Sequence, residues 1–365
     1  MRKLIGSFGA LACTLVLAAQ AWGSAAPNAR AAVQQGVITV GGRTLFPVML
    51  LDQCGAAAAA HAASLGVNVI LNASCDASPH RQLSSLSRRQ LGILPIGGRA
   101  VQGTKLLGWT YPDEPDNNGW TPGALARAYS FRQGTPDGLL SFLTTTAAFY
   151  TDADKQVATA RTAGFAHLAD VAGFDLYPLN HCRSSLVEVY DAQRRFARLA
   201  HGKPTFQWIE TGAIQPGYCG GITVTPAQVT AEAWLAVAGG ARGIGFFTHT
   251  WTPAHSEFSV APAVQQAIRQ FAVSAAAIRP GLTGTTTDAT VDTPAMRILA
   301  RVGGGKTYVI AINTLSSVVP ATITVPRLGT GKLTVLGPGR TIPVYGGKFQ
   351  DTLPPLGVRV YATPD

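Results

Sequence analysis

The middle of the chain alternates short apolar runs with alanine-rich segments, which predicts strands and helices in turn. The expected strands cover Phe46–Leu51, Val67–Leu71, Gly92–Ile96, Leu107–Tyr111, Leu140–Thr145, Gly173–Tyr177, Thr205–Ile209 and Gly243–Phe247. The expected helices cover Ala56–Leu65, Pro79–Arg89, Pro122–Ala128, Asp152–Ala163, Ser185–Ala200, Pro226–Val237 and Ala261–Ala277. Such alternation is typical of a parallel sheet wrapped by helices, and eight strands close into a barrel. We therefore predict an α/β fold, a (β/α)8 TIM barrel.

A doubly wound open sheet is the competing architecture. It would call for a glycine-rich phosphate-binding turn after an early strand, and no G-x-G-x-x-G motif stands there. The barrel is therefore favoured, although the third crossover, Gly97 to Lys105, is too short for a full helix.

From about Ile278 the pattern changes to short alternating strands separated by glycine turns. These strands are expected at Met296–Val302, Thr307–Asn313, Ala321–Val325, Lys332–Leu336, Arg340–Val344 and Val358–Tyr361. They predict a small C-terminal antiparallel β-sandwich over 279–365, after a barrel domain over 36–278. An early hairpin, Gly36–Val40 and Arg43–Leu45, either caps the barrel floor or joins the sandwich.

The N-terminus has the features of a secretory signal peptide. Arg2 and Lys3 precede an apolar run, and the small-x-small triplet Ala19-Gln20-Ala21 ends it. The run is too short for a transmembrane span, and Cys13 lacks the lipobox of a lipid anchor. We therefore expect cleavage near residue 21, a flexible segment over 22–35, no integral membrane span, and a secreted or cell-envelope protein.

Loss of this peptide would leave four cysteines, Cys54, Cys75, Cys182 and Cys219. An even number in an oxidising compartment predicts two disulfides. Each cysteine follows an expected strand, so pairing Cys54 with Cys75 and Cys182 with Cys219 would join neighbouring loops. Three connectivities are possible for four cysteines.

The formal net charge of +10 falls to +8 once Arg2 and Lys3 are removed, since 10 − 2 = 8. A basic protein suits an anionic cell-wall surface. Charged residues make up only 13% of the chain, and no basic cluster with interleaved aromatic residues occurs. These observations argue against nucleic-acid binding.

Two glutamates lie where expected barrel strands end. Glu114 follows the fourth strand in Asp113-Glu114-Pro115, and Glu210 ends the seventh in Trp208-Ile209-Glu210. The carboxyl ends of barrel strands converge on one cleft, and glycoside hydrolysis uses a pair of carboxyl groups. Of the other glutamates, Glu188 and Glu232 fall in helices and are expected on solvated faces.

This arrangement resembles that of the clan-A glycoside hydrolases, which are retaining enzymes on a (β/α)8 barrel. The resemblance spans about Phe46 to Trp251 and implies that Glu114 is the acid/base and Glu210 the nucleophile. Many members of the clan place asparagine before the acid/base to bind the sugar 2-hydroxyl, whereas this chain has Asp113. An ionised aspartate cannot donate that hydrogen bond, and its charge would raise the pKa of Glu114.

Further side chains are expected to bind substrate in the same cleft. Strand alternation puts Asp175 and Tyr177 on one face of the sixth strand, and the resemblance implies that such a tyrosine orients the nucleophile. Tryptophan packs well on the apolar faces of sugar rings, and in the clan a tryptophan at the position of Trp251 often lines the site. Further candidates for sugar contacts are Trp208, His249, Asp52 and Asn72, although core, turn or cap roles are open for Trp208, Asp52 and Asn72.

Other chemistries lack their motifs. The histidines show no H-E-x-x-H spacing and no Cys-x-x-Cys occurs, so we expect neither a metal nor another cofactor. No G-x-S-x-G elbow of a serine hydrolase is present. The favoured hypothesis is a secreted retaining glycosidase acting on a poly- or oligosaccharide by double displacement. A non-catalytic carbohydrate-binding barrel and a transglycosylase are the alternatives.

Overall fold

The computed structural model describes residues 31–72, 75, 78–95, 105–130, 138–182, 185–215, 217, 219, 221–251, 256–337 and 339–364. The expected signal peptide, residues 22–30 and most of the third crossover lie outside these residues. No helix in the described part of the chain is both long enough and apolar enough to cross a membrane.

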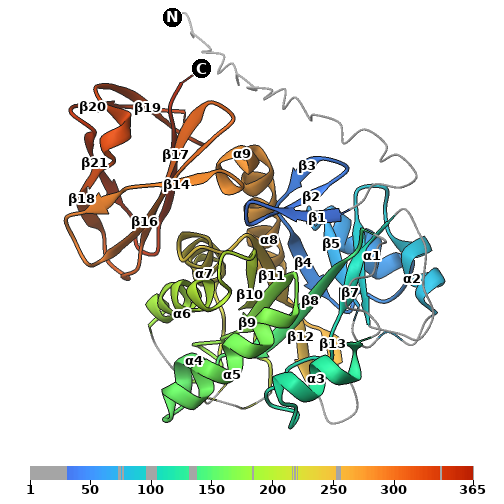
Figure 1. The fold of residues 1–365 in the computed structure, drawn as a ribbon. Coiled ribbons are helices and arrows are strands. Elements are labelled where there is room, and N and C mark those ends of the chain that lie inside the picture. Colours follow the sequence, from blue (N-terminus) through green and yellow to red (C-terminus); the bar gives the residue numbers. More distant parts are fainter. Residues whose placement is uncertain are drawn as a thin grey trace, which may run out of the picture.

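Eight parallel strands form a closed barrel, as predicted (Figure 1). In chain order they are β4 (Val48–Leu51), β5 (Val69–Leu71), β6 (Leu91–Pro95), β7 (Leu106–Thr110), β8 (Leu140–Thr146), β9 (Val171–Asp175), β10 (Thr205–Glu210) and β11 (Gly243–Phe247). Strand β11 pairs in parallel with β4 and closes the barrel. Side chains of β10 alternate between the two faces of the barrel wall. Phe206 and Trp208 pack inside the barrel, whereas Ile209 packs against the outer helices.

One glycine makes room for a residue of the barrel interior. A Cβ atom on Gly245 in β11 would lie 2.2 Å from the Trp208 indole of the adjacent strand β10. Glycine at this position therefore lets the indole lie flat across the neighbouring backbone.

Helices surround the barrel and follow its strands (Figure 1). They are α1 (Gly55–Ser64), α2 (Pro79–Ser85), α3 (Pro122–Ala128), α4 (Ala148–Thr151), α5 (Lys155–Leu168), α6 (Val187–Leu199), α7 (Pro226–Ala238), α8 (Pro262–Ala277) and α9 (Arg279–Leu282). Several begin with proline in the first turn, and Thr225 and Gln228 form a capping box at the start of α7. The short helices α4 and α9 were not predicted, because four residues carry no helical periodicity.

A three-stranded sheet covers the floor of the barrel. It contains β1 (Ala31–Gln34), β2 (Val37–Val40) and β3 (Arg43–Leu45), so the early hairpin caps the barrel and does not join the sandwich. The amide of Ala31 donates to the carbonyl of Gly138, just before β8 begins, at 2.7 Å. The prediction of a flexible segment over 22–35 is therefore wrong for Ala31–Gln34, because pairing with β2 satisfies the backbone of these residues.

The C-terminal domain is an antiparallel sandwich of two sheets, as predicted. One sheet has the order β14 (Thr285–Thr287), β16 (Met296–Gly303), β17 (Lys306–Asn313), β22 (Val358–Ala362), β19 (Gly331–Val335) and β20 (Thr341–Val344). The other has the order β15 (Thr290–Val291), β18 (Val319–Thr324) and β21 (Lys348–Leu353). The first sheet packs on the barrel through α7. Between β11 and α8, β12 (His249–Trp251) and β13 (Ser256–Phe258) form an unpredicted hairpin.

Candidate active site

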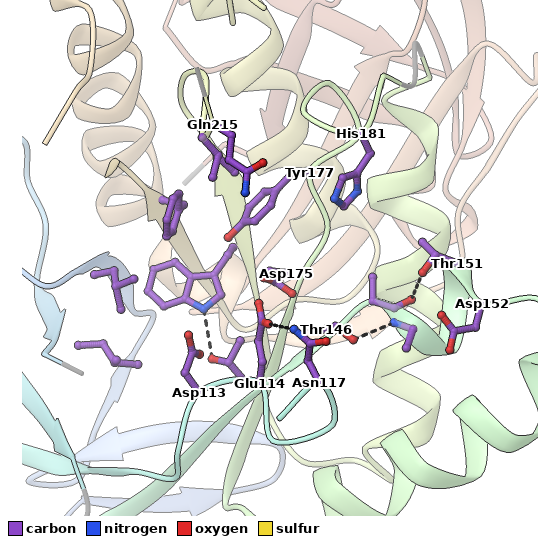
Figure 2. A pocket seen from close by; sticks show the side chains of 18 residues that line it. Asp113, Glu114, Asn117, Thr146, Thr151, Asp152, Asp175, Tyr177, His181 and Gln215 are labelled. Carbon is purple, nitrogen blue, oxygen red and sulfur yellow. Dashed lines mark hydrogen bonds between the residues drawn. The ribbon is translucent and has the colours of Figure 1, made fainter. Parts of the chain in front are cut away.

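A cavity of about 460 Å³ opens where the barrel strands end (Figure 2). Its size is in the range of small-molecule and cofactor sites. Carboxyl groups, hydroxyls and aromatic rings line it together. The lining residues include Asp113 and Glu114 after β7, Thr144 and Thr146 in β8, Asp152 after α4, Asp175 and Tyr177 at the end of β9, Trp208 in β10, and Phe247 in β11.

Glu114 lies on the cavity wall in a strained backbone conformation. Its φ of 41° is in the left-handed region, which residues other than glycine seldom adopt. The turn is held by the amides of Asn117 and Asn118, which both donate to the Glu114 carbonyl at 3.0 Å. The Asn117 side chain donates to the Glu114 carboxylate at 3.0 Å. The proline-rich turn thus directs this carboxyl group into the cavity.

Asp175 at the end of β9 is hydrogen-bonded to the Glu114 side chain. Burial first, and then the negative charge of Glu114, raise the pKa of Asp175 well above its ordinary value. Two carboxyl groups in contact can form this bond only when one of them carries a proton. Asp175 is therefore the protonated partner and Glu114 the acceptor.

Asp113 is a third carboxyl group that lines the cavity. Its pKa is raised to about 7 because the cavity walls keep bulk water away and because the charges of Glu114 and Asp52 lie nearby. The residue as a whole is nevertheless exposed at the cavity. Asp113 consequently changes its protonation state near neutral pH.

Aromatic side chains complete the cavity. The Trp208 indole nitrogen donates to the Thr144 hydroxyl at 3.2 Å, which fixes the ring on the wall (Figure 2). Tyr177 is 9% exposed and packs against Phe247 with 5.7 Å between ring centroids. Phe174 and Leu176 point the other way, into the layer under the helices. The predicted alternation of this strand is therefore confirmed.

Glu210 ends β10, as predicted, but its side chain does not line the cavity. It is 0% exposed and accepts hydrogen bonds from the amides of Leu179 and Asn180, each at 2.8 Å, and from the Asn180 side chain at 2.6 Å. Burial raises the pKa of Glu210 against the opposing effect of these bonds. The carboxylate anchors the loop after β9.

Glu232 is the second member of this buried group. It is 0% exposed, so the expectation of a solvated face is wrong for this residue. The cause is its direction, because the side chain lies beside Glu210 at the end of β10, on a helix that is buried along most of its length. Burial, the charge of Glu210 and a hydrogen bond to Glu210 raise the pKa of Glu232 well above its ordinary value. Glu232 is thus the protonated partner of Glu210.

The remaining predicted residues lie around this end of the barrel. Asp52 follows β4 with a φ of 45° and lies close enough to Asp113 to influence its pKa. The His249 imidazole Nε2 lies 3.0 Å from the Leu51 carbonyl. Asn72 is buried, 2% exposed, after β5 and does not line the cavity. The side chain of Trp251 lies outside the described part of the structure.

Both disulfides join loops at the cavity end. Cys54 pairs with Cys75 and Cys182 pairs with Cys219, with Cα–Cα distances of 5.6 and 5.2 Å. The loops after β4 and β5 are thereby linked, as are those after β9 and β10. Among the described residues, no group of three or more His, Cys, Asp or Glu side chains is placed to hold a metal ion.

The sequence did not single out Asp175 as a site residue, although alternation placed it on the face of Tyr177. Asn117 and Thr144 were missed because a lone asparagine or threonine carries no distinctive signal. The bonds from Asn180 to Glu210 span 30 residues and connect a loop to a strand end, so no local pattern reveals them.

Solved structures with a similar fold include several named as glycoside hydrolases. The α-amylase of Geobacillus thermoleovorans complexed with acarbose aligns with a TM-score of 0.58 and 12% identity over 87% of this chain and 98% of that chain. The GH30 endoxylanase of Clostridium papyrosolvens C71 aligns with a TM-score of 0.52 and 12% identity over 88% and 97%. At such identities the likeness shows a shared fold of barrel and C-terminal domain.

A maltogenic α-amylase of Thermotoga neapolitana aligns with a TM-score of 0.53 and 8% identity over 87% of this chain and 98% of that chain. Neither the protein-family models nor the curated proteins compared with this sequence give a match. The comparisons therefore agree with the barrel architecture, while the chemistry has to be argued from the site.

Proposed function

We propose that this protein is a glycoside hydrolase that cleaves O-glycosidic bonds of an oligo- or polysaccharide in the cavity at the end of the barrel. The observation that carries the proposal is the meeting of carboxyl groups from two strand ends, Glu114 after β7 and Asp175 in β9, beside the rings of Tyr177 and Trp208. Sugar cleavage needs proton transfer to the leaving oxygen and a wall that accepts the apolar face of a ring.

Glu114 is the acid/base in this proposal, as expected from the sequence. Asp175 holds a proton in its hydrogen bond to Glu114. When a sugar is bound, the proton of Asp175 moves to Glu114, and Glu114 protonates the glycosidic oxygen as the bond to the anomeric carbon breaks. The negative charge left on the pair stabilises the positive charge that develops on the sugar ring.

Asp113 is the group proposed to activate water. A general base works best when its pKa lies near the working pH, and the pKa of Asp113 is raised to about 7. In its ionised form Asp113 takes a proton from the water that attacks the anomeric carbon. One displacement by water inverts the configuration at that carbon, and it requires the sugar to bind between the two carboxyl groups, with the water on the side of Asp113 and the leaving oxygen on the side of Glu114.

The double displacement expected from the sequence requires Glu210 to face the sugar. Its carboxylate already accepts three hydrogen bonds and is fully buried. The geometry therefore favours an anchoring role for Glu210. A second mechanism, with Glu210 as nucleophile and retention of configuration, is favoured only by its place on β10, two residues beyond Trp208.

The test is a panel of neutral, amino and acidic oligosaccharides with α and β linkages, incubated with the full mature chain. We expect reducing ends to appear with at least one substrate and to be lost in Glu114→Gln and Asp175→Asn. The control is Asp191→Asn, the same type of change on the exposed face of α6. Binding of glycans without turnover across the panel would instead support a non-catalytic carbohydrate-binding protein.

We also propose that the protein is exported. The two disulfides support this, because such bonds persist in oxidising compartments. Mass spectrometry of protein recovered from culture medium should show a new N-terminus near residue 22, whereas an intact N-terminus on protein retained inside the cell would contradict export.

A further inference from the structure

The charge of the cavity is opposite to that of the protein. Four carboxyl groups line it, those of Asp113, Glu114, Asp152 and Asp175, and among the described residues neither lysine nor arginine does. The whole chain carries 29 lysines and arginines against 19 acidic residues, so the described wall of the cavity has the opposite balance of charge to the chain. His181, an exposed side chain, is the one basic group on the described wall.

Among the described residues, the charged groups that act most strongly on Asp113 and Asp175 are themselves acidic. The groups that act on Asp113 are Glu114, Asp52 and Asp116, and those that act on Asp175 are Glu114, Asp113 and Asp116. In the view of Figure 2, Asp113 and Asp152 lie on opposite sides of the cavity, with Glu114 and Asp175 between them. A ligand in this space is therefore surrounded by acidic groups.

Tyr177 gives an independent sign of a ligand. Its side chain is nine-tenths buried, and its hydroxyl points into the cavity (Figure 2). No hydrogen bond from this hydroxyl to another residue is found in the described part of the chain, and the oxygen is not among the fully buried polar atoms there, so it is open to a ligand in the cavity. A bound molecule with a polar group at this position would supply a partner.

The acidic lining of the cavity and the Tyr177 hydroxyl limit which chemical groups a ligand can carry. A uronate, sulfate or phosphate group would be repelled by the carboxylates. A neutral sugar would leave their charges uncompensated, and an N-acetylated sugar carries no charge either. A protonated amine supplies N–H donors to the carboxylates and, beside them, to the Tyr177 oxygen.

We propose that the sugar bound in this cavity carries a free, protonated amine, so that the substrate is a glycan containing non-acetylated amino sugars. The proposal rests on the proposed glycosidase function and adds its substrate class. The carboxyl groups that line the cavity attract the ammonium group, and Trp208 receives the apolar face of the ring.

The test compares one sugar in two forms. Free-amine oligosaccharides of glucosamine and of galactosamine are titrated into Asp175→Asn, which is expected to lack turnover and to keep the charge of Glu114, by calorimetry at pH 6 and low salt, beside the same material after N-acetylation. We expect the free-amine form to bind about ten-fold more tightly or better, with the advantage shrinking as salt is added. Turnover by the wild-type protein is measured on the same pairs and on galacturonate oligosaccharides.

Two further variants locate the effect. Asp152→Asn should lower the preference for the free amine about two- to five-fold, because it removes one charge of the wall. Tyr177→Phe should weaken binding of the free-amine form by a similar factor, through the lost hydroxyl. Asp191→Asn, on the exposed face of α6, should leave the preference unchanged.

The outcomes separate this proposal from the proposed function. Hydrolysis of neutral or N-acetylated glycans with no preference for the free amine would overturn the amino-sugar proposal and leave the glycosidase standing. Tight binding of the free-amine form with no cleavage would support the amine site and contradict the hydrolase. Preferential binding of galacturonate would overturn the amine site outright.

Discussion

The ends of the barrel strands carry two pairs of carboxyl groups that look alike in the sequence and differ in the structure. Glu114 and Asp175 form one pair on the wall of an open cavity, beside Asp113 and Tyr177. Glu210 and Glu232 form the other, and both are 0% exposed. In each pair one carboxyl group holds the proton of a hydrogen bond to the other.

The two pairs differ in how many hydrogen bonds they already accept from other residues. The oxygens of Glu210 accept three hydrogen bonds from Leu179 and Asn180, so they have little capacity left for a ligand. Glu114 receives one bond from the exposed side chain of Asn117 besides that of Asp175. A carboxyl group at the cavity keeps oxygen lone pairs available for a ligand. A buried carboxyl group whose lone pairs are already in use mainly stabilises the fold.

The largest expected effect concerns the cavity pair. Glu114→Gln should lower turnover about 10²- to 10⁴-fold, because it removes the group that transfers the proton. The melting temperature should stay close to that of the wild type, since the Glu114 side chain lines an open cavity. Steady-state kinetics and thermal unfolding of Glu114→Gln beside Asp191→Asn measure both, and full activity of Glu114→Gln would remove the cavity pair from the mechanism.

The buried pair should respond to mutation mainly in stability. Glu210→Ala removes the acceptor of three hydrogen bonds and should lower the free energy of unfolding by about 3 kcal/mol or more. Glu114→Ala should cost less than about 1 kcal/mol, because its partner Asn117 is exposed and can bind water. Urea unfolding measures the difference. A Glu210→Ala variant of wild-type stability with no turnover would point to Glu210 as nucleophile.

The pH dependence of turnover tests the roles of the cavity residues Asp113 and Asp175. Asp113 must be ionised to take a proton from water, so kcat/KM should rise up to about ten-fold per pH unit below its pKa of about 7. At higher pH turnover should fall as Asp175 loses the proton that it holds, since the pKa of Asp175 is raised. Asp113→Asn should abolish the rising limb. A profile flat between pH 5 and 8 would contradict the role of Asp113.

The smallest effect concerns Glu232. A raised pKa means that the folded state holds the proton more tightly, so the contribution of Glu232 to stability is complete below its ordinary pKa of 4.5 and is lost as the pH rises through the folded-state pKa. The side-chain amide of glutamine donates a hydrogen bond at any of these pH values, because its N–H groups do not titrate. Glu232→Gln should therefore be about 1 kcal/mol more stable than the wild type at pH 8, with a smaller difference at pH 4. Urea unfolding at both pH values measures this, and equal differences would contradict a shared proton.

The sequence predicted the barrel well because each of its strands is a compact apolar run that ends at a turn. The sandwich was predicted for the same reason, although the short strands β14 and β15 and the longer strand β21 were missed. In β21, Phe349 and Leu353 face the sandwich core while the residues between them, from Gln350 to Thr352, are polar. So few apolar positions leave the alternation weak.

The site could be predicted in part. The prediction that Glu114 and Glu210 stand where barrel strands end is correct, since the end of a strand depends on the local sequence pattern. The direction of the Glu210 side chain depends on Asn180 in a loop and on Glu232 in a helix, and no spacing reveals such contacts. The burial of Glu232 depends on the contact with Glu210, which lies 22 residues earlier in the chain (232 − 210 = 22).

The most direct test of the account is the anomeric configuration of the first product, followed by proton NMR during hydrolysis of a glycan that the protein cleaves. The cavity carboxyl groups of Asp113, Glu114 and Asp175 predict a single displacement by water and an inverted anomer. A retained anomer, together with a covalent adduct of a 2-deoxy-2-fluoro glycoside on Glu210, would contradict this and assign the nucleophile to the buried pair.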